Sequence, residues 1–177
     1  MSFTSTVLVI HEEDDHTIRS AYTYMTVAII GGLVTLMGLF MMYQMAGTLN
    51  MAELTEFMHA QEDKTAYYAV GVLILFGFAA KAGLFPLHIW LPNAYSVAPA
   101  PSSALLSCIL TKTGVFGTII VSCKLFMHDA QWGNLILILG IITMVMGAVL
   151  AVFSVNLKRT LACSSMSQIG FIIIAIG

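Results

Sequence analysis

Two lysines, Lys81 and Lys112, interrupt a long apolar part of the chain where charged side chains are unexpected. The residues between them, 82–111, contain no Asp, Glu, Lys or Arg and hold all four prolines of the protein. An ammonium group at the centre of a bilayer costs about 3 kcal/mol or more, so such groups normally serve transport or pair with another charge. We interpret Lys81 and Lys112 as candidate proton carriers.

A helix break is predicted just after Lys81, between Gly83 and Pro86. Proline removes a backbone donor and clashes with the preceding turn, and glycine weakens a helix. Broken membrane helices occur where the freed backbone groups face protein or water, and in transporters they mark the binding site. His88 follows the break, and a membrane histidine either relays protons or makes a structural hydrogen bond.

Polar side chains beside Lys112 and early in the last helix form a candidate polar path. In an apolar segment they need hydrogen-bond partners or water, although hydroxyl groups also let helices pack closely. The residues of this path are Thr111, Ser164, Ser165 and Gln168. Elsewhere, His11 and His16 flank four acids, but their spacing does not fit the zinc-protease pattern, so we expect no metal site.

The elements that position these residues must be membrane-spanning helices. The chain is 59% hydrophobic and 9% charged, with a mean hydropathy of +0.92, which is typical of an all-α, multi-pass integral membrane protein. Charge-free runs at residues 20–52, 82–111 and 130–157 each exceed the roughly 20 residues that cross a bilayer. We predict four complete spans near residues 21–45, 67–90, 102–126 and 135–155, partial helices at both ends, a surface helix near 49–58 and a short extended linker over 92–101.

Three glycines in the first of these spans, Gly31, Gly32 and Gly38, are predicted points of close helix approach. Membrane helices pack closely where small residues let their backbones come together.

The charge pattern constrains location and partners. Counting spans places the loops near residues 11–19, 92–101 and 156–159 on the same side of the membrane. These loops carry three basic residues, against two on the other side. Because basic residues are more frequent in cytoplasmic loops, the first side is favoured as cytoplasmic. The net charge of −2 and the lack of a basic run argue against nucleic acid as a partner. The expected partners lie in the lipid bilayer of the cell (inner) membrane.

The stretch KAGLFPLHIWLPNAYSVAPAPSSALLSCILTKTGVFG, followed by NLKRTLACSSMSQIGF, resembles the antiporter-like membrane subunits of respiratory complex I (NADH:quinone oxidoreductase), of Mrp antiporters and of energy-converting hydrogenases. That family has about fourteen helices with two inverted repeats. The resemblance implies that residues 1–177 form a single membrane domain, the central part of a longer one, from the end of helix five to helix ten. Lys81 then matches the lysine of broken helix seven, Lys112 the lysine of helix eight, and His88 the family's Pro-Leu-His signature.

The function implied by this resemblance is proton translocation in a redox-driven complex, through buried lysines and water. Other membrane subunits would be partners, peripheral redox subunits would contribute indirectly, and no cofactor or redox site is expected in this chain. The family's partner glutamate on helix five would fall before Met1. We expect Lys81 and Lys112 to face a shared hydrated cavity, with the charge of Lys81 being switched. The alternatives are an Mrp-type cation/proton antiporter subunit, a purely structural subunit and, with the least support, a membrane enzyme.

Overall fold

The computed structural model describes residues 2–10, 14–127 without 61–64, and 129–177. These residues are almost entirely helical and contain no strand. The elements are α1 (Ser2–Val9), α2 (Asp15–Ala46), α3 (Met51–Ala60), α4 (Thr65–Ala82), the 3-10 turn η1 (Leu87–Ile89), α5 (Trp90–Val97), α6 (Ala100–Leu105), the π-helical η2 (Leu106–Leu110), α7 (Thr111–Ile120), the π-helical η3 (Val121–Leu125), α8 (Ala130–Val152) and α9 (Leu157–Ile176).

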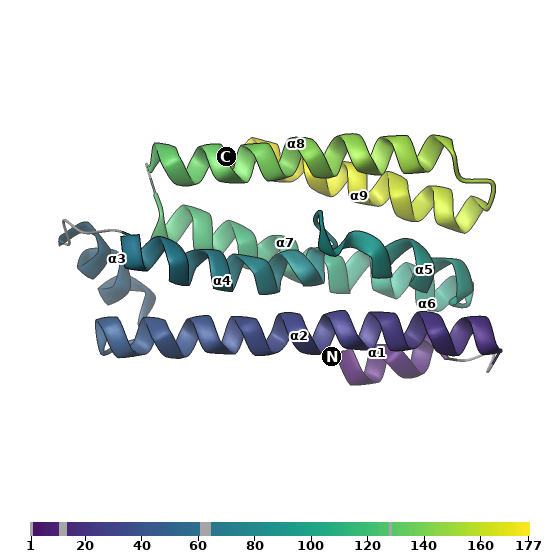
Figure 1. Cartoon of the computed structure of the whole chain (residues 1–177), viewed down its shortest axis with the longest axis horizontal. Coiled ribbons are helices and arrows are strands. Elements are labelled where there is room, and N and C mark those ends of the chain that lie inside the picture. Colours follow the sequence, from purple (N-terminus) through teal and green to yellow (C-terminus); the bar gives the residue numbers. More distant parts are fainter. Residues whose placement is uncertain (1, 11–13, 61–64, 128) are drawn as a thin grey trace.

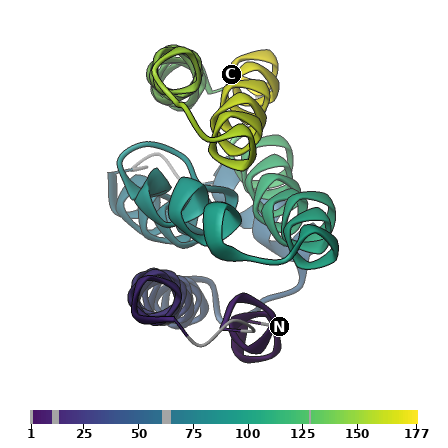
Figure 2. The same ribbon diagram turned by 90° about the vertical axis from the view of Figure 1, so that its right-hand side faces the viewer.

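The helices run side by side in an elongated bundle with three layers. Helices α4, α5, α6 and α7 form the middle layer, between α1 and α2 on one side and α8 and α9 on the other (Figures 1 and 2). Among the described residues, five segments are long and apolar enough to cross a membrane, namely Thr17–Ala46, Thr65–Val97, Ala100–Leu125, Ala130–Val152 and Leu157–Ile176. The predicted all-α membrane fold and its four complete spans are confirmed.

The last span, α9, is longer than the partial helix that the sequence predicts. Its 20 residues are enough to cross a bilayer. The helix begins early because the side chain of Asn156 caps it and accepts a hydrogen bond of 3.1 Å from the backbone N–H of Lys158. The short surface helix predicted near residues 49–58 is found as α3.

Close backbone contact holds α2 against α4. A Cβ atom on Gly31 would lie 2.7 Å from the Cβ of Ala80, and one on Gly38 would lie 2.7 Å from a side-chain carbon of Ile74. These two glycines lie where the sequence predicts close helix approach. The same prediction for Gly32 is wrong, because nothing lies within 4 Å of its Cβ position. Adjacent residues of a helix point about 100° apart, so Gly31 and Gly32 do not both point directly at α4.

The span that carries Lys81 is broken at the predicted place. Helix α4 ends at Ala82, Gly83 follows with φ 77°, and the Phe85–Pro86 peptide bond is cis. The chain then resumes as η1 and α5. A positive φ of this size is readily adopted only by glycine, which explains why α4 stops here.

The prediction of an extended linker over residues 92–101 is wrong, because α5 and the start of α6 occupy most of this range. The chain is helical to Val97, and only Ala98 and Pro99 are extended, with ψ of 145° and 153°. Pro92 is the third residue of α5, where the backbone N–H would have no intrahelical partner in any case. A proline in the first turn therefore does not prevent the helix.

The start of α2, the corner between α5 and α6, and the connection between α8 and α9 all lie at the same end of the bundle (Figure 1). Counting spans predicted that these three loops lie on the same side of the membrane, and their positions in the bundle agree with that prediction.

Candidate functional site

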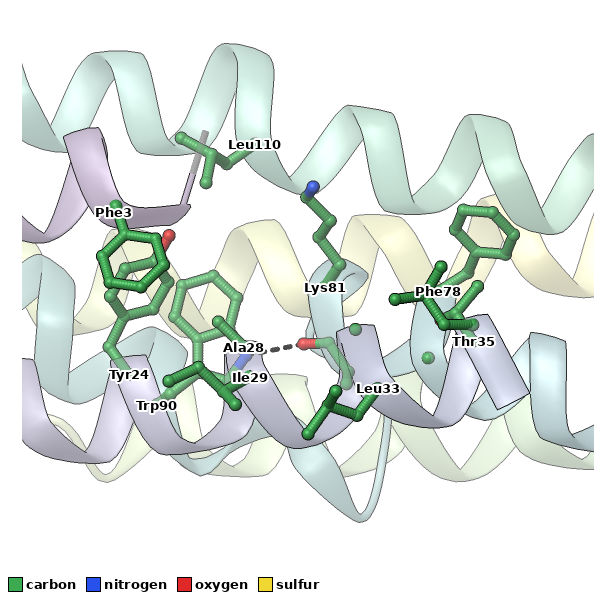
Figure 3. Close-up of a pocket in the computed structure, with 14 residues that line it drawn as sticks. Phe3, Tyr24, Ala28, Ile29, Leu33, Thr35, Phe78, Lys81, Trp90 and Leu110 are labelled. Atoms are coloured by element: carbon green, nitrogen blue, oxygen red, sulfur yellow. Dashed lines mark hydrogen bonds between the residues drawn. The ribbon is translucent and has the colours of Figure 1, made fainter. Parts of the chain in front are cut away.

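Lys81 lies in the last turn of α4 and is half-buried. Its side chain lines a cavity of about 550 Å³ that also touches α1, α2, α5 and the end of η2. Its ammonium group points away from α4, toward the helix that carries Leu110 (Figure 3). Four aromatic rings contribute to the cavity wall, those of Phe3, Tyr24, Phe78 and Trp90.

Few polar groups accompany the Lys81 ammonium in this cavity. Within the described parts of the chain it makes no recorded ion pair or hydrogen bond. The Tyr24 hydroxyl forms a hydrogen bond of 2.6 Å with Ser5, and the Thr35 hydroxyl donates to the Gly31 carbonyl at 2.8 Å. The amine therefore lies in a largely apolar chamber beside the helix break.

Backbone groups freed by the break are satisfied by side chains from elsewhere. The indole N–H of Trp90 donates to the Ala80 carbonyl at 2.8 Å, and the backbone N–H of Phe85 donates to the Thr143 hydroxyl on α8 at 3.1 Å. The Trp90 bond is drawn in Figure 3. The Ala80 carbonyl thus already has a donor other than Lys81.

Lys112 lies on the first turn of α7, but its side chain is exposed and is not among the residues that line the Lys81 cavity. The expected shared cavity is therefore not found within the described chain. Helix α7 faces α4 through Gly114, whose Cβ position would be 2.8 Å from the Cα of Ala82. Lys112 precedes Gly114 by two residues, so its side chain points about 200° around the helix from Gly114 and away from α4.

The span around Lys112 is also less regular than the continuous helix predicted for it. The π-helical segments η2 and η3 lie on either side of α7. A π-helical turn uses more residues per turn than an α-helix and shifts the faces of the helix that follows. A regular 3.6-residue period therefore cannot predict how this span is oriented.

His88 lies in η1 and its ring stacks on Phe85 with centroids 5.7 Å apart. Its Nδ1 atom is buried, and no described residue forms a hydrogen bond with it. The side chain does not line the Lys81 cavity. The relay and structural roles of His88 both stay predictions.

The residues of the predicted polar path separate into two groups. Ser164 and Gln168 are exposed on one face of α9. Ser165 lines a second cavity, of about 360 Å³, with Tyr95, Ser103, Ser107 and Lys158. Thr111 is buried nearby and donates to the Ser107 carbonyl at 2.8 Å.

Sequence reasoning missed two tyrosines at these cavities, Tyr24 and Tyr95. Tyr24 lies among other polar residues without a motif to mark it, and Tyr95 lies within the stretch that carries the family resemblance, which does not single it out. The possible metal site at His11 and His16 is not tested, because His11 and the side chain of His16 lie outside the described residues. Among the described residues, no group of three or more His, Cys, Asp or Glu is placed to hold a metal ion.

A lysine-bearing cavity beside a broken span, within a bundle of membrane helices, is an arrangement that also occurs in membrane transport proteins. Residues 1–177 match the family described as NADH:quinone oxidoreductase/Mrp antiporter, transmembrane, and the chain belongs to this family. The resemblance seen in the sequence and the multi-pass membrane location are thereby confirmed.

Relatives from three branches of the family are similar to this chain in sequence. Hydrogenase-4 component B of Escherichia coli is 34% identical over 100% of this chain and 26% of its own length. A Na(+)/H(+) antiporter subunit of Alkalihalophilus pseudofirmus is 32% identical over 100% of this chain and 36% of its own. NAD(P)H-quinone oxidoreductase chain 4 1 of Picosynechococcus is 43% identical over 58% of this chain and 19% of its own.

Two solved membrane complexes contain chains with this fold. A chain of the Mrp complex from Dietzia aligns with a TM-score of 0.84 and 28% identity, covering 92% of this chain and 30% of that one. A chain of the archaeal membrane-bound sulfane sulfur reductase aligns with a TM-score of 0.88 and 26% identity, covering 99% of this chain and 36% of that one. The present chain thus spans about a quarter to a third of the length of these relatives.

Proposed function

We propose that this chain is part of a proton-translocating membrane subunit of a redox-driven complex, and that Lys81 is the group that takes up and releases the proton. The observation that carries the proposal is the position of the Lys81 amine, half-buried in an aromatic-walled cavity next to the helix break. An amine in such a place responds strongly to any nearby charge, because solvent screens the interaction poorly. Lysine suits this role because its amine loses its proton readily when buried.

The negative charge that controls Lys81 would approach from the side of α1. Helix α1 brings Phe3 to the wall of the cavity. The resemblance aligns α1 with the end of family helix five, whose glutamate precedes it. A carboxylate at that place would favour the ammonium form of Lys81, and its withdrawal or neutralisation would favour proton release.

Lys112 is proposed as a second proton carrier, on the opposite face of α7 from the Lys81 cavity. Its exposed side chain, and those of Ser164 and Gln168, are available to helices outside this chain. Residues 1–177 would then be the central membrane unit of a longer subunit. Transfer between the lysines would pass around the close contact of α4 and α7, with His88 or Thr111 as candidate relay groups.

The partners proposed are other membrane subunits, with peripheral redox subunits acting at a distance. Two observations support this. The two solved structures described above are membrane complexes, one of them respiratory. The described helices also carry large apolar side chains on the outside of the bundle, such as Leu33, Phe40 and Phe116, with exposed fractions of 61%, 68% and 63%, which suit contact with lipid or with other membrane helices.

A second candidate function is cation/proton antiport of the Mrp type. It is favoured by the antiporter relative from Alkalihalophilus pseudofirmus, which aligns over the whole chain. Measuring transport with and without sodium separates the candidates. Proton movement that requires sodium on the opposite side of the membrane indicates antiport, whereas redox-dependent movement without sodium indicates the first function.

The Lys81 role is tested with Lys81→Met and Lys81→Arg in the complete complex, reconstituted in vesicles with a pH-sensitive dye. Both variants are expected to assemble and to lose proton transfer about a hundredfold or more, because neither side chain can cycle its proton. Lys124→Met is the matched control, since Lys124 is an exposed lysine at the end of η3.

Two results would contradict the switching role of Lys81. Normal pumping by Lys81→Arg, with loss in Lys81→Met, would make the residue a fixed charge. Failure of the complex to assemble with Lys81→Met would indicate that Lys81 is a purely structural ion-pair partner.

A further inference from the structure

Tyr95 lines the second cavity and carries a buried hydroxyl group without a hydrogen-bond partner among the described residues. The Tyr95 side chain on α5 is only 4% exposed. Its hydroxyl forms no hydrogen bond with any residue that the structure describes. Leaving a buried hydroxyl unpaired is unfavourable, so a retained one generally has a function or binds water.

The second cavity extends along α9 from Lys158 to Ser165, and Tyr95 is one of the side chains that line it. Lys158, near the start of α9, marks its outer part and donates from Nζ to the Ala98 carbonyl at 3.0 Å. Ser165 also lines it and lies seven residues further along α9, which is about 10 Å deeper at 1.5 Å per residue. Ser103 and Ser107 supply hydroxyls from the opposite wall. Such a wall can hold water, because polar groups recur along it.

Tyr95 also packs in the buried cluster that contains Tyr24 and Leu110. Leu110 lines the Lys81 cavity. Tyr24 itself lines the Lys81 cavity (Figure 3). Tyr95 therefore stands between a cavity that begins at the bundle end and the cavity that holds Lys81.

We propose that Tyr95 is a proton-transfer residue that connects the two cavities and supplies protons to Lys81. The proposal rests on the proposed function of Lys81. In each transfer, the Tyr95 oxygen accepts a proton from a hydronium ion in the outer cavity, while its own hydroxyl proton passes to a water molecule on the Tyr24 side. Tyr95 is neutral before and after, nothing is oxidised or reduced, and the proton ends on the Lys81 amine.

Tyr95→Phe separates this role from packing. Phenylalanine keeps the ring and removes only the unpartnered hydroxyl, so it is expected to leave folding and assembly unchanged or slightly improved. A purely structural Tyr95 therefore predicts normal transport in this variant. A relay predicts an assembled complex in which proton transfer slows about tenfold or more.

The experiment compares Tyr95→Phe, Tyr22→Phe and Lys81→Met in the complete complex, using dye-reported proton uptake in vesicles. Tyr22 is the matched control, because its side chain is 71% exposed on α2. Slow transfer in Tyr95→Phe with normal transfer in Tyr22→Phe is the expected result. Normal transfer in Tyr95→Phe, with loss in Lys81→Met, overturns the relay and leaves the Lys81 function standing. Normal transfer in Lys81→Met refutes the Lys81 function and the relay with it.

Water access to the second cavity is tested without measuring transport. In a background where Cys108, Cys123 and Cys163 are replaced by alanine, Ser107→Cys is treated with a membrane-impermeant methanethiosulfonate reagent from each side. Labelling is expected only from the side of the α8–α9 connection, whereas Ile109→Cys, on an exposed apolar face, should stay unlabelled. Protection of Ser107→Cys from both sides would overturn the proposed water route.

Discussion

Replacing Gly31 with alanine is expected to weaken the packing of α2 on α4, whereas the same change at Gly32 is not. A Cβ at Gly31 would lie 2.7 Å from the Cβ of Ala80, closer than real Cβ contacts, and 3.4 Å from the Gly77 carbonyl. At Gly32 nothing lies within 4 Å. Both changes gain about 1 kcal/mol of helix propensity, which cancels when the two variants are compared. The difference that remains is the overpacking at Gly31, about 1–3 kcal/mol.

The free energy of unfolding is measured for the full-length protein in mixed micelles, by titration with a denaturing detergent. Gly31→Ala is expected to unfold at a lower detergent fraction than Gly32→Ala. Because the two residues are adjacent on one helix, they lie at nearly the same depth in the membrane and differ in the direction they face. Equal or greater stability of Gly31→Ala would show that α2 and α4 are not in the close contact described here.

The helix break gives two further predictions for the same unfolding assay. Trp90→Phe removes the donor to the Ala80 carbonyl and is expected to lower the free energy of unfolding by about 1–3 kcal/mol, because a buried acceptor loses its partner; an unchanged midpoint would contradict that hydrogen bond. Gly83→Ala forces a side chain into a left-handed conformation with φ 77° and should cost about 1–2 kcal/mol. Normal stability in Gly83→Ala would argue against a positive φ at this position.

The spans and the break could be predicted because their signals are local. Long charge-free runs identify membrane helices whatever their neighbours are, and the pair of Gly83 and Pro86 ends a helix by its own backbone chemistry. The same local rule misjudged residues 92–97, where Pro92 is accepted in the first turn of α5. Whether a proline breaks a helix or begins one depends on where the helix starts, and the chain around Pro92 does not reveal this.

The orientation of the site residues could not be predicted from the sequence. Lys112 and Thr111 are adjacent, yet Thr111 is buried and Lys112 is exposed. Which of them faces α4 depends on the contact at Gly114 and on the π-helical turn before it. Tyr95 lies within the stretch that carries the family resemblance, but the sequence does not single it out, because the feature that marks it is a buried hydroxyl without a hydrogen-bond partner among the described residues.

The bond between Trp90 and Ala80 has a consequence for the timescale of charge switching. It joins the two sides of the broken span directly, and the bond from Phe85 to Thr143 ties the intervening loop to α8. Bending at the break would cost these hydrogen bonds, so they resist a hinge motion there. Rotation of the Lys81 side chain leaves both bonds in place. Such rotations take picoseconds to nanoseconds in exposed side chains, whereas hinge motions take microseconds to milliseconds. The slow step of a transport cycle would therefore lie outside the broken helix, in the approach of the controlling charge or in a partner subunit.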